Sequence, residues 1–204
     1  FLGALTHSLL SDPNVSVIKV DVGGSHSREC EMLGGKEYRL NLDRPSGLNP
    51  FEALKHNVSG EFLRSVLSQF IEVLVKEEGE RTLSKALRAE IDQNLAGYME
   101  DEPSSPSLDD FYRFANGFSR RNLLARWCGT GLYANAFKVK GGGAASADSR
   151  AGACGADTSA EAAFKRERQM TRLRYFNFSE IYQGADPEYS QAVMAAVLVE
   201  FNIQ

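Results

Sequence analysis

The segment Val15–Ser25, VSVIKVDVGGS, combines the pattern of a buried β-strand with a glycine-rich turn. Its first half is rich in β-branched residues, and the turn sequence Asp12-Pro13-Asn14 precedes it. An acidic residue, Asp21, comes where the strand should end. In open α/β sheets, ligands bind just outside the carboxyl ends of the parallel strands. We therefore predict a ligand site at this point, and its residues are Asp21, Gly23, Gly24 and Ser25.

The fractions of hydrophobic and charged residues are typical of a globular protein. The chain has 204 residues, of which 43% are hydrophobic and 25% are charged, which allows one sizeable domain with a small subdomain. The net charge of −4 means that any nucleic-acid contact needs a local basic patch. The three cysteines and three histidines show no metal-ligand spacing, so we expect neither a structural zinc nor a disulfide framework. Reduced thiols favour a cytoplasmic location.

Hydrophobic periodicity predicts a sheet with a helical insertion. Strands are expected at residues 15–21, 36–42 and 173–178, with a helix at 1–11 and a short helix at 28–33. The insertion is expected to contain an αα-hairpin, and residues 132–139 are expected to be extended. The sequence contains no run of about 18 apolar residues, so we predict no membrane span. Both ends of the chain lie within apolar helical patterns, so we expect a piece of a larger protein.

Four regions follow from this pattern. The first is an α/β segment, the second is mostly helical, the third is rich in Ala and Gly with basic residues and is expected to be flexible, and the fourth returns to the sheet with a strand and a helix. Their expected boundaries are residues 1–49, 50–140, 141–170 and 171–204.

The chain lacks the motifs that would assign catalytic residues. The phosphate-loop pattern G-x-x-x-x-G-K-[ST] is absent, and Gly34-Gly35-Lys36 lacks both the first glycine and the final hydroxyl residue. No Ser/His/Asp or Cys/His triad can be assigned either. We interpret the three histidines as surface residues, and the catalytic residues stay unassigned.

The turn after Asp21 allows three interpretations. It resembles the loop that holds S-adenosylmethionine in methyltransferases, with Asp43 as the residue that would bind a ribose. The short helix at 28–33 argues against this interpretation, because such crossovers usually carry about three helical turns. Alternatively, the strand lies beside the phosphate loop of a nucleoside triphosphatase. In the simplest interpretation, Asp21 only caps the short helix.

Basic residues suggest contacts with phosphate groups or DNA. Arg120 and Arg121 are adjacent, and one of them could act as an arginine finger at a subunit boundary. A second basic cluster near residues 165–174 ends with Arg172 and Arg174, although such a run is often a solvated helix face. The residues that we predict to contact phosphate or DNA are therefore Arg120, Arg121, Arg172 and Arg174.

Four segments together resemble one family. They are VIKVDVGGSHSRECEMLGGKEYRLNL, GLNPF, WCGTGLYANAF and RLRYFNFSEI. They resemble the ATPase domain of the conjugative-transfer ATPases of type IV secretion systems, the TraC-like branch of the FtsK/HerA group of RecA-like motors. The resemblance implies an α/β fold, namely a RecA-like P-loop NTPase core fragment with a mostly parallel sheet and an inserted helical subdomain.

The resemblance also implies where the nucleotide-binding and metal-binding residues of the family lie. In the family, the phosphate loop precedes a helix like residues 1–11, and the metal-binding acid follows a helix like residues 188–204. We therefore expect the full-length parent to use ATP and Mg²⁺, while this fragment binds neither tightly, contains no metal ligand and is inactive alone.

The expected function is a part of the motor that hydrolyses ATP to drive DNA or protein transfer or pilus assembly. The expected partners are further copies in a hexamer, other type IV secretion components and DNA, at the cytoplasmic face of the bacterial inner membrane. Two alternatives stay open. One is a non-catalytic binding or scaffolding module of the secretion machinery, and the other is an S-adenosylmethionine-dependent methyltransferase.

Overall fold

The chain divides into two compact units in its computed structural model, which describes residues 2–55, 60–138, 172–182 and 187–202. One unit contains the sheet and is formed by residues 1–40 and 141–180. The other unit is helical and is formed by residues 41–140 and 181–204. Both units thus combine segments that are distant in the sequence.

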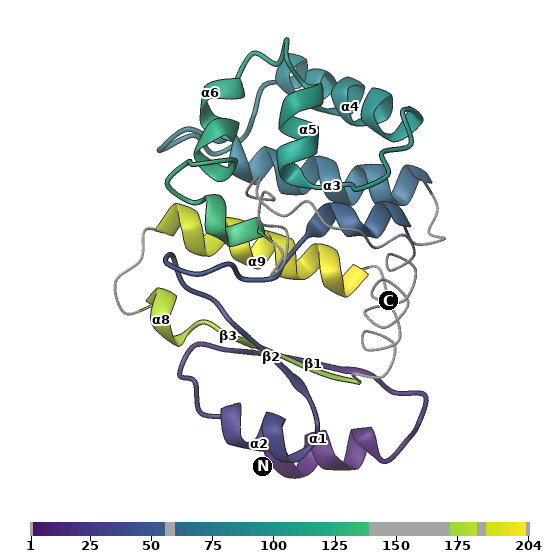
Figure 1. Cartoon of the computed structure of the whole chain (residues 1–204), viewed down its shortest axis with the longest axis vertical. Helices are drawn as coiled ribbons and strands as arrows, with labels where there is room; N and C mark the ends of the chain where they lie inside the picture. The colour runs from purple at the N-terminus through teal and green to yellow at the C-terminus, as the bar shows by residue number, and fades with distance from the viewer. Residues whose placement is uncertain (1, 56–59, 139–171, 183–186, 203–204) are drawn as a thin grey trace, which may run out of the picture. The chain divides into compact units, whose positions relative to one another are not determined.

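The sheet of the first unit is parallel, as the sequence predicts. Its described strands follow the order β1-β3-β2, so the last strand in the sequence is the central one (Figure 1). Val17 lies opposite Leu173 and Asp21 lies opposite Asn177. The carboxyl ends of the strands therefore meet at one edge of the sheet. The strands are β1 (Val17–Asp21), β2 (Lys36–Arg39) and β3 (Leu173–Asn177).

Two helices, α1 (Leu2–Leu10) and α2 (Ser27–Met32), cover one face of this sheet (Figure 1). Leu173 and Tyr175 of β3 form a small core with Cys30 of α2. The six residues of α2 are enough for the crossover from β1 to β2, which passes one intervening strand. The short helix that the sequence predicts therefore does not prevent a parallel arrangement, because neighbouring strands are only about 5 Å apart.

Gly35, directly before β2, lies against the small core of the sheet unit. A Cβ atom at this position would lie 2.7 Å from the Cys30 Sγ and 2.8 Å from the Leu173 Cγ. We expect Gly35→Ala to lower the free energy of unfolding by about 1–3 kcal/mol, because an added methyl group overpacks this core. Gly60→Ala is the matched control, since no atom of the described residues lies within 4 Å of its added Cβ. Urea unfolding measures both, and equal stabilities would contradict the prediction.

The helical unit is organised around a helix pair and a distant third helix. The αα-hairpin predicted from the sequence is present as α3 (Gly60–Leu74) and α4 (Lys85–Glu100), which pack against each other. The Ser84 hydroxyl caps α4 by accepting a hydrogen bond from the Leu87 N–H. The long helix α9 (Pro187–Asn202) packs against α3. Its apolar composition fits this buried position.

Short helices complete the described structure. The expected extended segment at 132–139 is wrong, because residues 134–137 form a 3₁₀ helix. One helical turn places Tyr133 and Phe137 against the same side chain, Trp127. The short helices are the 3₁₀ helices η1 (Pro50–Lys55), η2 (Ala125–Trp127) and η3 (Ala134–Phe137), and the α-helices α5 (Leu108–Phe114), α6 (Arg121–Leu124) and α8 (Ser179–Tyr182).

The Ala/Gly-rich region predicted at 141–170 lies outside the described residues. Within the described ranges, every helix is too short or too polar to cross a bilayer.

Candidate functional site

The loop after β1 is closed by the carboxylate of Asp21. Its Oδ1 accepts a hydrogen bond from the Gly23 N–H at 2.9 Å. Its Oδ2 accepts from the Ser25 N–H at 2.8 Å, from the Ser25 hydroxyl at 3.0 Å and from the Tyr175 hydroxyl at 2.9 Å. The Gly23 N–H and these further donors lower the pKa of Asp21 to about 2. Asp21 is therefore ionised at neutral pH and determines the loop conformation.

This geometry assigns different tasks to the four predicted site residues. The N–H groups of Gly23 and Ser25 donate to Asp21, so they are not directed at a ligand. Gly24 has a φ of +70° and lies against Ser179, where an added Cβ would be 3.1 Å from the hydroxyl. Gly23 is exposed, and the Asp21 carboxylate is the nearest described group to a Cβ placed there. Gly23 therefore provides the open backbone surface of the loop.

The end of β3 supports the loop with residues that the sequence analysis missed. The Asn177 side chain is buried, and its Nδ2 donates to Glu37 Oε1 at 2.9 Å. The Ser27 hydroxyl donates to the same oxygen at 2.7 Å, and Asn177 Oδ1 accepts from the Ser179 N–H. Burial raises the pKa of Glu37, but these hydrogen bonds outweigh it and the pKa is lowered. In the sequence, the role of Asn177 was indicated by its position as a polar residue at the end of the strand pattern LRYFN.

A second ionic cluster joins the loop to β1 and α2. Glu29 Oε2 lies 2.8 Å from the Lys19 Nζ and 2.7 Å from the His26 Nδ1. The hydrogen bond from Lys19 is the main reason why the pKa of Glu29 is lowered. The other oxygen, Glu29 Oε1, would lie 3.3 Å from a Cβ at Gly3. The first turn of α1 therefore lies beside Glu29 of α2, and the first turn of a helix carries unpaired N–H groups.

Two of the predicted phosphate-contacting arginines belong to the helical unit. The Arg120 guanidinium donates to both oxygens of Glu80, at 2.5 and 3.1 Å, and to the Val75 carbonyl at 2.9 Å. This pairing lowers the pKa of Glu80. The Arg121 guanidinium stacks 4.2 Å above the ring centroid of Tyr112. Arg120 therefore acts as a structural clamp, whereas Arg121 lies on an aromatic face.

The other two arginines belong to the sheet unit. Arg172 precedes β3, and its guanidinium donates to the carbonyls of Leu10 and Asp12 at 2.9 and 2.8 Å. It thereby caps the carboxyl end of α1, at the edge of the sheet opposite Asp21. Arg174 lies within β3 in register with Ile18. The structure thus separates Arg172 from the Asp21 loop.

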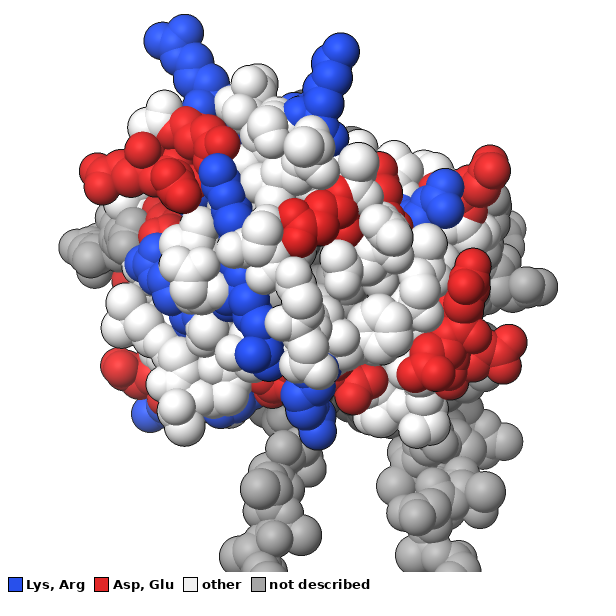
Figure 2. Space-filling view, turned by 90° about the horizontal axis from the view of Figure 1, so that it is seen from above, with Lys and Arg blue, Asp and Glu red and all other residues white. Residues whose placement is uncertain are grey.

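On the face displayed in Figure 2, acidic and basic side chains alternate without a field of one sign.

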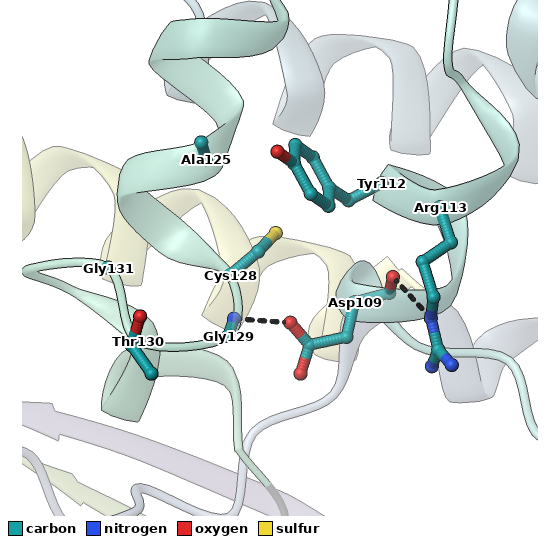
Figure 3. A pocket seen from close by; sticks show the side chains of 8 residues that line it. All are labelled: Asp109, Tyr112, Arg113, Ala125, Cys128, Gly129, Thr130 and Gly131. Carbon is teal, nitrogen blue, oxygen red and sulfur yellow. Dashed lines mark hydrogen bonds between the residues drawn. The ribbon is translucent and has the colours of Figure 1, made fainter.

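The motif WCGTG forms a pocket within the helical unit (Figure 3). Its volume is about 530 Å³, and α5 and the segment 125–131 supply its lining residues. The Gly129 N–H donates to Asp109 Oδ1 at 2.7 Å, and the Arg113 Nε donates to the Asp109 carbonyl. Burial raises the pKa of the Cys128 thiol, which makes it an unreactive structural residue. Among the residues described, no cluster of metal-ligating side chains occurs.

Comparison with known proteins identifies the family. A model of the TraG P-loop domain matches residues 2–126, which is more than half of the chain. The chain belongs to the TraG P-loop domain family. This membership confirms the resemblance to conjugative-transfer and type IV secretion ATPases. The matched segment contains the Asp21 loop and most of the helical unit, so both are parts of the TraG-type domain.

Solved structures support the fold of this TraG-family domain. The structure of VirB4 of Thermoanaerobacter pseudethanolicus matches with a TM-score of 0.59 over 98% of this chain and 51% of the VirB4 chain. The sequence identity is 16%, so the likeness supports the fold. The chain thus spans about half the length of that VirB4. No curated protein matches.

Proposed function

We propose that this chain is part of the ATPase domain of a type IV secretion motor. The motor hydrolyses ATP to drive DNA or protein transfer or pilus assembly. Within it, the edge of the sheet at the carboxyl ends of β1 and β3 forms one wall of the nucleotide site. The observation that carries this proposal is the position of the Asp21 loop at the carboxyl edge of the parallel sheet, where such sheets bind ligands. The first turn of α1 lies against Glu29, which contacts His26 at the end of that loop.

In this proposal the loop contributes shape rather than charge. Asp21 holds the turn, while the exposed Gly23 backbone lets a ligand approach closely. ATP and Mg²⁺ are bound in the full-length protein, with the phosphate loop and the metal-binding acid supplied by other segments. The sheet edge of this chain therefore completes a site that it does not form alone.

The remaining parts of the proposal concern the assembly. The full-length protein forms a hexamer at the cytoplasmic face of the inner membrane, where it contacts other secretion components and DNA. Arg121, which stacks on the Tyr112 ring, is the better candidate for contacts with phosphate or DNA, and Arg174 stays a candidate. Arg120 and Arg172 donate hydrogen bonds within their own units, which favours a structural role for both.

A bulky residue at position 23 tests the nucleotide wall. We expect Gly23→Leu to weaken ATP binding of the full-length protein by about 10-fold, because the side chain fills the space above the loop. The fold tolerates the change, since Asp21 Oδ1 at 3.6 Å is the closest described contact of the added Cβ. Gly117→Leu is the control, because nothing in the described part of the chain lies within 4 Å of its added Cβ. Titration with a fluorescent ATP analogue gives the affinities.

The outcomes distinguish the candidate functions. Equal ATP affinities for the wild type and Gly23→Leu would remove this loop from the nucleotide site. A full-length protein that binds no ATP would favour the non-catalytic binding or scaffolding module. Membership in a P-loop family gives no support to the methyltransferase alternative.

A further inference from the structure

The pocket formed by the motif WCGTG has the size of a small-ligand site. Its volume of about 530 Å³ lies within the range of roughly 300–1,000 Å³ that such sites occupy. The Tyr112 hydroxyl points towards Ala125 across the pocket, and the Cys128 thiol points towards the Tyr112 ring (Figure 3). The neutral thiol, the methyl group and the aromatic ring make this part of the pocket apolar. It therefore suits a flat, weakly polar group.

The polar groups of the same pocket include donors and an acceptor that are open to a guest. Asp109 Oδ1 accepts from the Gly129 N–H, while the second carboxylate oxygen bonds to none of the residues drawn in Figure 3. The hydroxyls of Tyr112 and Thr130 likewise make no hydrogen bond to the residues drawn there. A ligand that carries both an acceptor and a donor satisfies both kinds of group.

Arg121 brings a positive charge to the Tyr112 wall of the pocket. Its guanidinium stacks 4.2 Å above the centroid of the Tyr112 ring. It lies one helical turn before Ala125 and projects from the same face of that helical segment. Its charge also acts on the Cys128 thiol, where it opposes the rise in pKa that burial causes. Within the described ranges, the buried Arg121 Nε has no hydrogen-bond partner and the side chain forms no ion pair. The aromatic ring thus holds a guanidinium that lacks an anion.

We infer that this pocket binds one nucleotide unit, at a site separate from that of ATP hydrolysis. The base packs against the Tyr112 ring, an N–H group of the base donates to Asp109, and the phosphate contacts Arg121. A phosphate alone, or an acidic side chain of a partner protein, would bring an anion to Arg121 but no donor to Asp109. A nucleotide combines a flat ring, a donor and an anion. The inference rests on the proposed contact of Arg121 with phosphate or DNA and assigns it a site.

Two sources share this chemistry, namely a free nucleotide and one nucleotide of single-stranded DNA. The charges around the pocket have both signs, since the Arg113 guanidinium lies 3.8 Å from the Asp110 carboxylate. Binding therefore depends on packing and on a single phosphate contact rather than on a basic surface. For a single-stranded probe, log K should fall with log salt concentration with a slope of about −0.7, the value for one phosphate.

Fluorescence anisotropy of a labelled oligodeoxycytidine tests the site in the full-length protein, with the ATP site saturated by a non-hydrolysable ATP analogue. We expect Tyr112→Ala and Arg121→Gln each to weaken binding about 10-fold, while Tyr112→Phe, which keeps the ring, stays close to the wild type. Arg64→Gln changes an exposed arginine of α3 outside the pocket and is the control. Circular dichroism checks the fold, and Arg121→Gln carries the test if Tyr112→Ala does not fold.

Asp109→Asn tests the contact with the base. The amide keeps an oxygen for the Gly129 N–H but replaces the second oxygen by a donor. It should reduce the preference for oligodeoxycytidine over oligodeoxythymidine, because cytosine has an amino group that donates to a carboxylate and thymine has none. A merely structural role of Asp109 would leave this preference unchanged. Competition by cytidine monophosphate at an affinity similar to that of the oligonucleotide identifies a free nucleotide as the ligand, and weak competition identifies DNA.

Wild-type affinity of Tyr112→Ala and Arg121→Gln for both probes overturns the inference. Displacement of neither probe but binding of an oligoglutamate peptide that depends on Arg121 would show a protein partner in the pocket instead, and would also overturn it. The proposed function is measured independently, because Gly23→Leu changes the sheet unit and its readout is ATP affinity. Loss of oligonucleotide binding in the pocket variants at unchanged ATP affinity supports the inference.

Discussion

Asp21→Asn is expected to lower the ATP turnover of the full-length protein about 100-fold while it changes the melting temperature little. The asparagine keeps one oxygen for the Gly23 N–H but replaces the other by an NH₂ group. That group cannot accept the three hydrogen bonds that Oδ2 accepts from Ser25 and Tyr175. The loop then shifts at the proposed nucleotide wall, and a displacement of about 1 Å in a catalytic site costs on the order of 100-fold in rate.

The stability of the same variant should fall by about 1 kcal/mol, because the loop is accessible to water and the lost hydrogen bonds are partly replaced. Asp12→Asn is the matched control. Asp12 accepts one hydrogen bond from the Asn14 N–H in a similar turn, next to Arg172 at the opposite edge of the sheet. Turnover and thermal unfolding are measured for both variants. If Asp21→Asn melts far below Asp12→Asn and keeps its turnover, Asp21 is a structural cap alone.

Phe51→Ala is expected to lower the free energy of unfolding by about 3–5 kcal/mol. Phe51 is fully buried at the centre of the aromatic core of the helical unit. Its ring contacts the rings of Phe70, Tyr98 and Phe111 at centroid distances of 6.5, 5.7 and 5.4 Å. Removing it leaves a cavity between η1, α3, α4 and α5, which these helices cannot close without losing their other contacts.

Chemical denaturation followed by circular dichroism measures this loss. Phe62→Ala is the control, because Phe62 also lies in the helical unit, on α3, but is 44% exposed. It should cost less than about 1 kcal/mol. Similar losses for the two variants would show that the core is not centred on Phe51. The motif GLNPF would then need an explanation other than packing.

Secondary structure was predictable where hydrophobic periodicity over a few residues decides it. The strand that ends at Asp21 and the two helices of the α3–α4 hairpin each follow a hydrophobic periodicity that repeats over a few residues. The extended interpretation of residues 132–139 failed because Tyr133 and Phe137 are drawn into one helical turn by Trp127. A tertiary contact thus outweighed a weak local preference.

The partners of polar side chains were the least predictable part of the site. Tyr175 and Asp21 are 154 positions apart, and Asn177 and Glu37 are 140 positions apart. The same limit applies to the arginines. Arg120 and Arg172 are as basic as any phosphate ligand, but their neighbours Glu80 and the end of α1 bind them internally. Charge in the sequence shows which groups need a partner, and only the fold shows which partner they have.

The sequence by itself determined the glycine turn after Asp21, the helical insertion and the family to which the segments belong, because periodicity and turn chemistry act over a few residues. The tertiary structure decided that β3 is the central strand and that Asp21 closes its own loop. These features depend on the pairing of strands from opposite ends of the chain. Such pairing is fixed by the burial of a shared apolar face rather than by any local pattern.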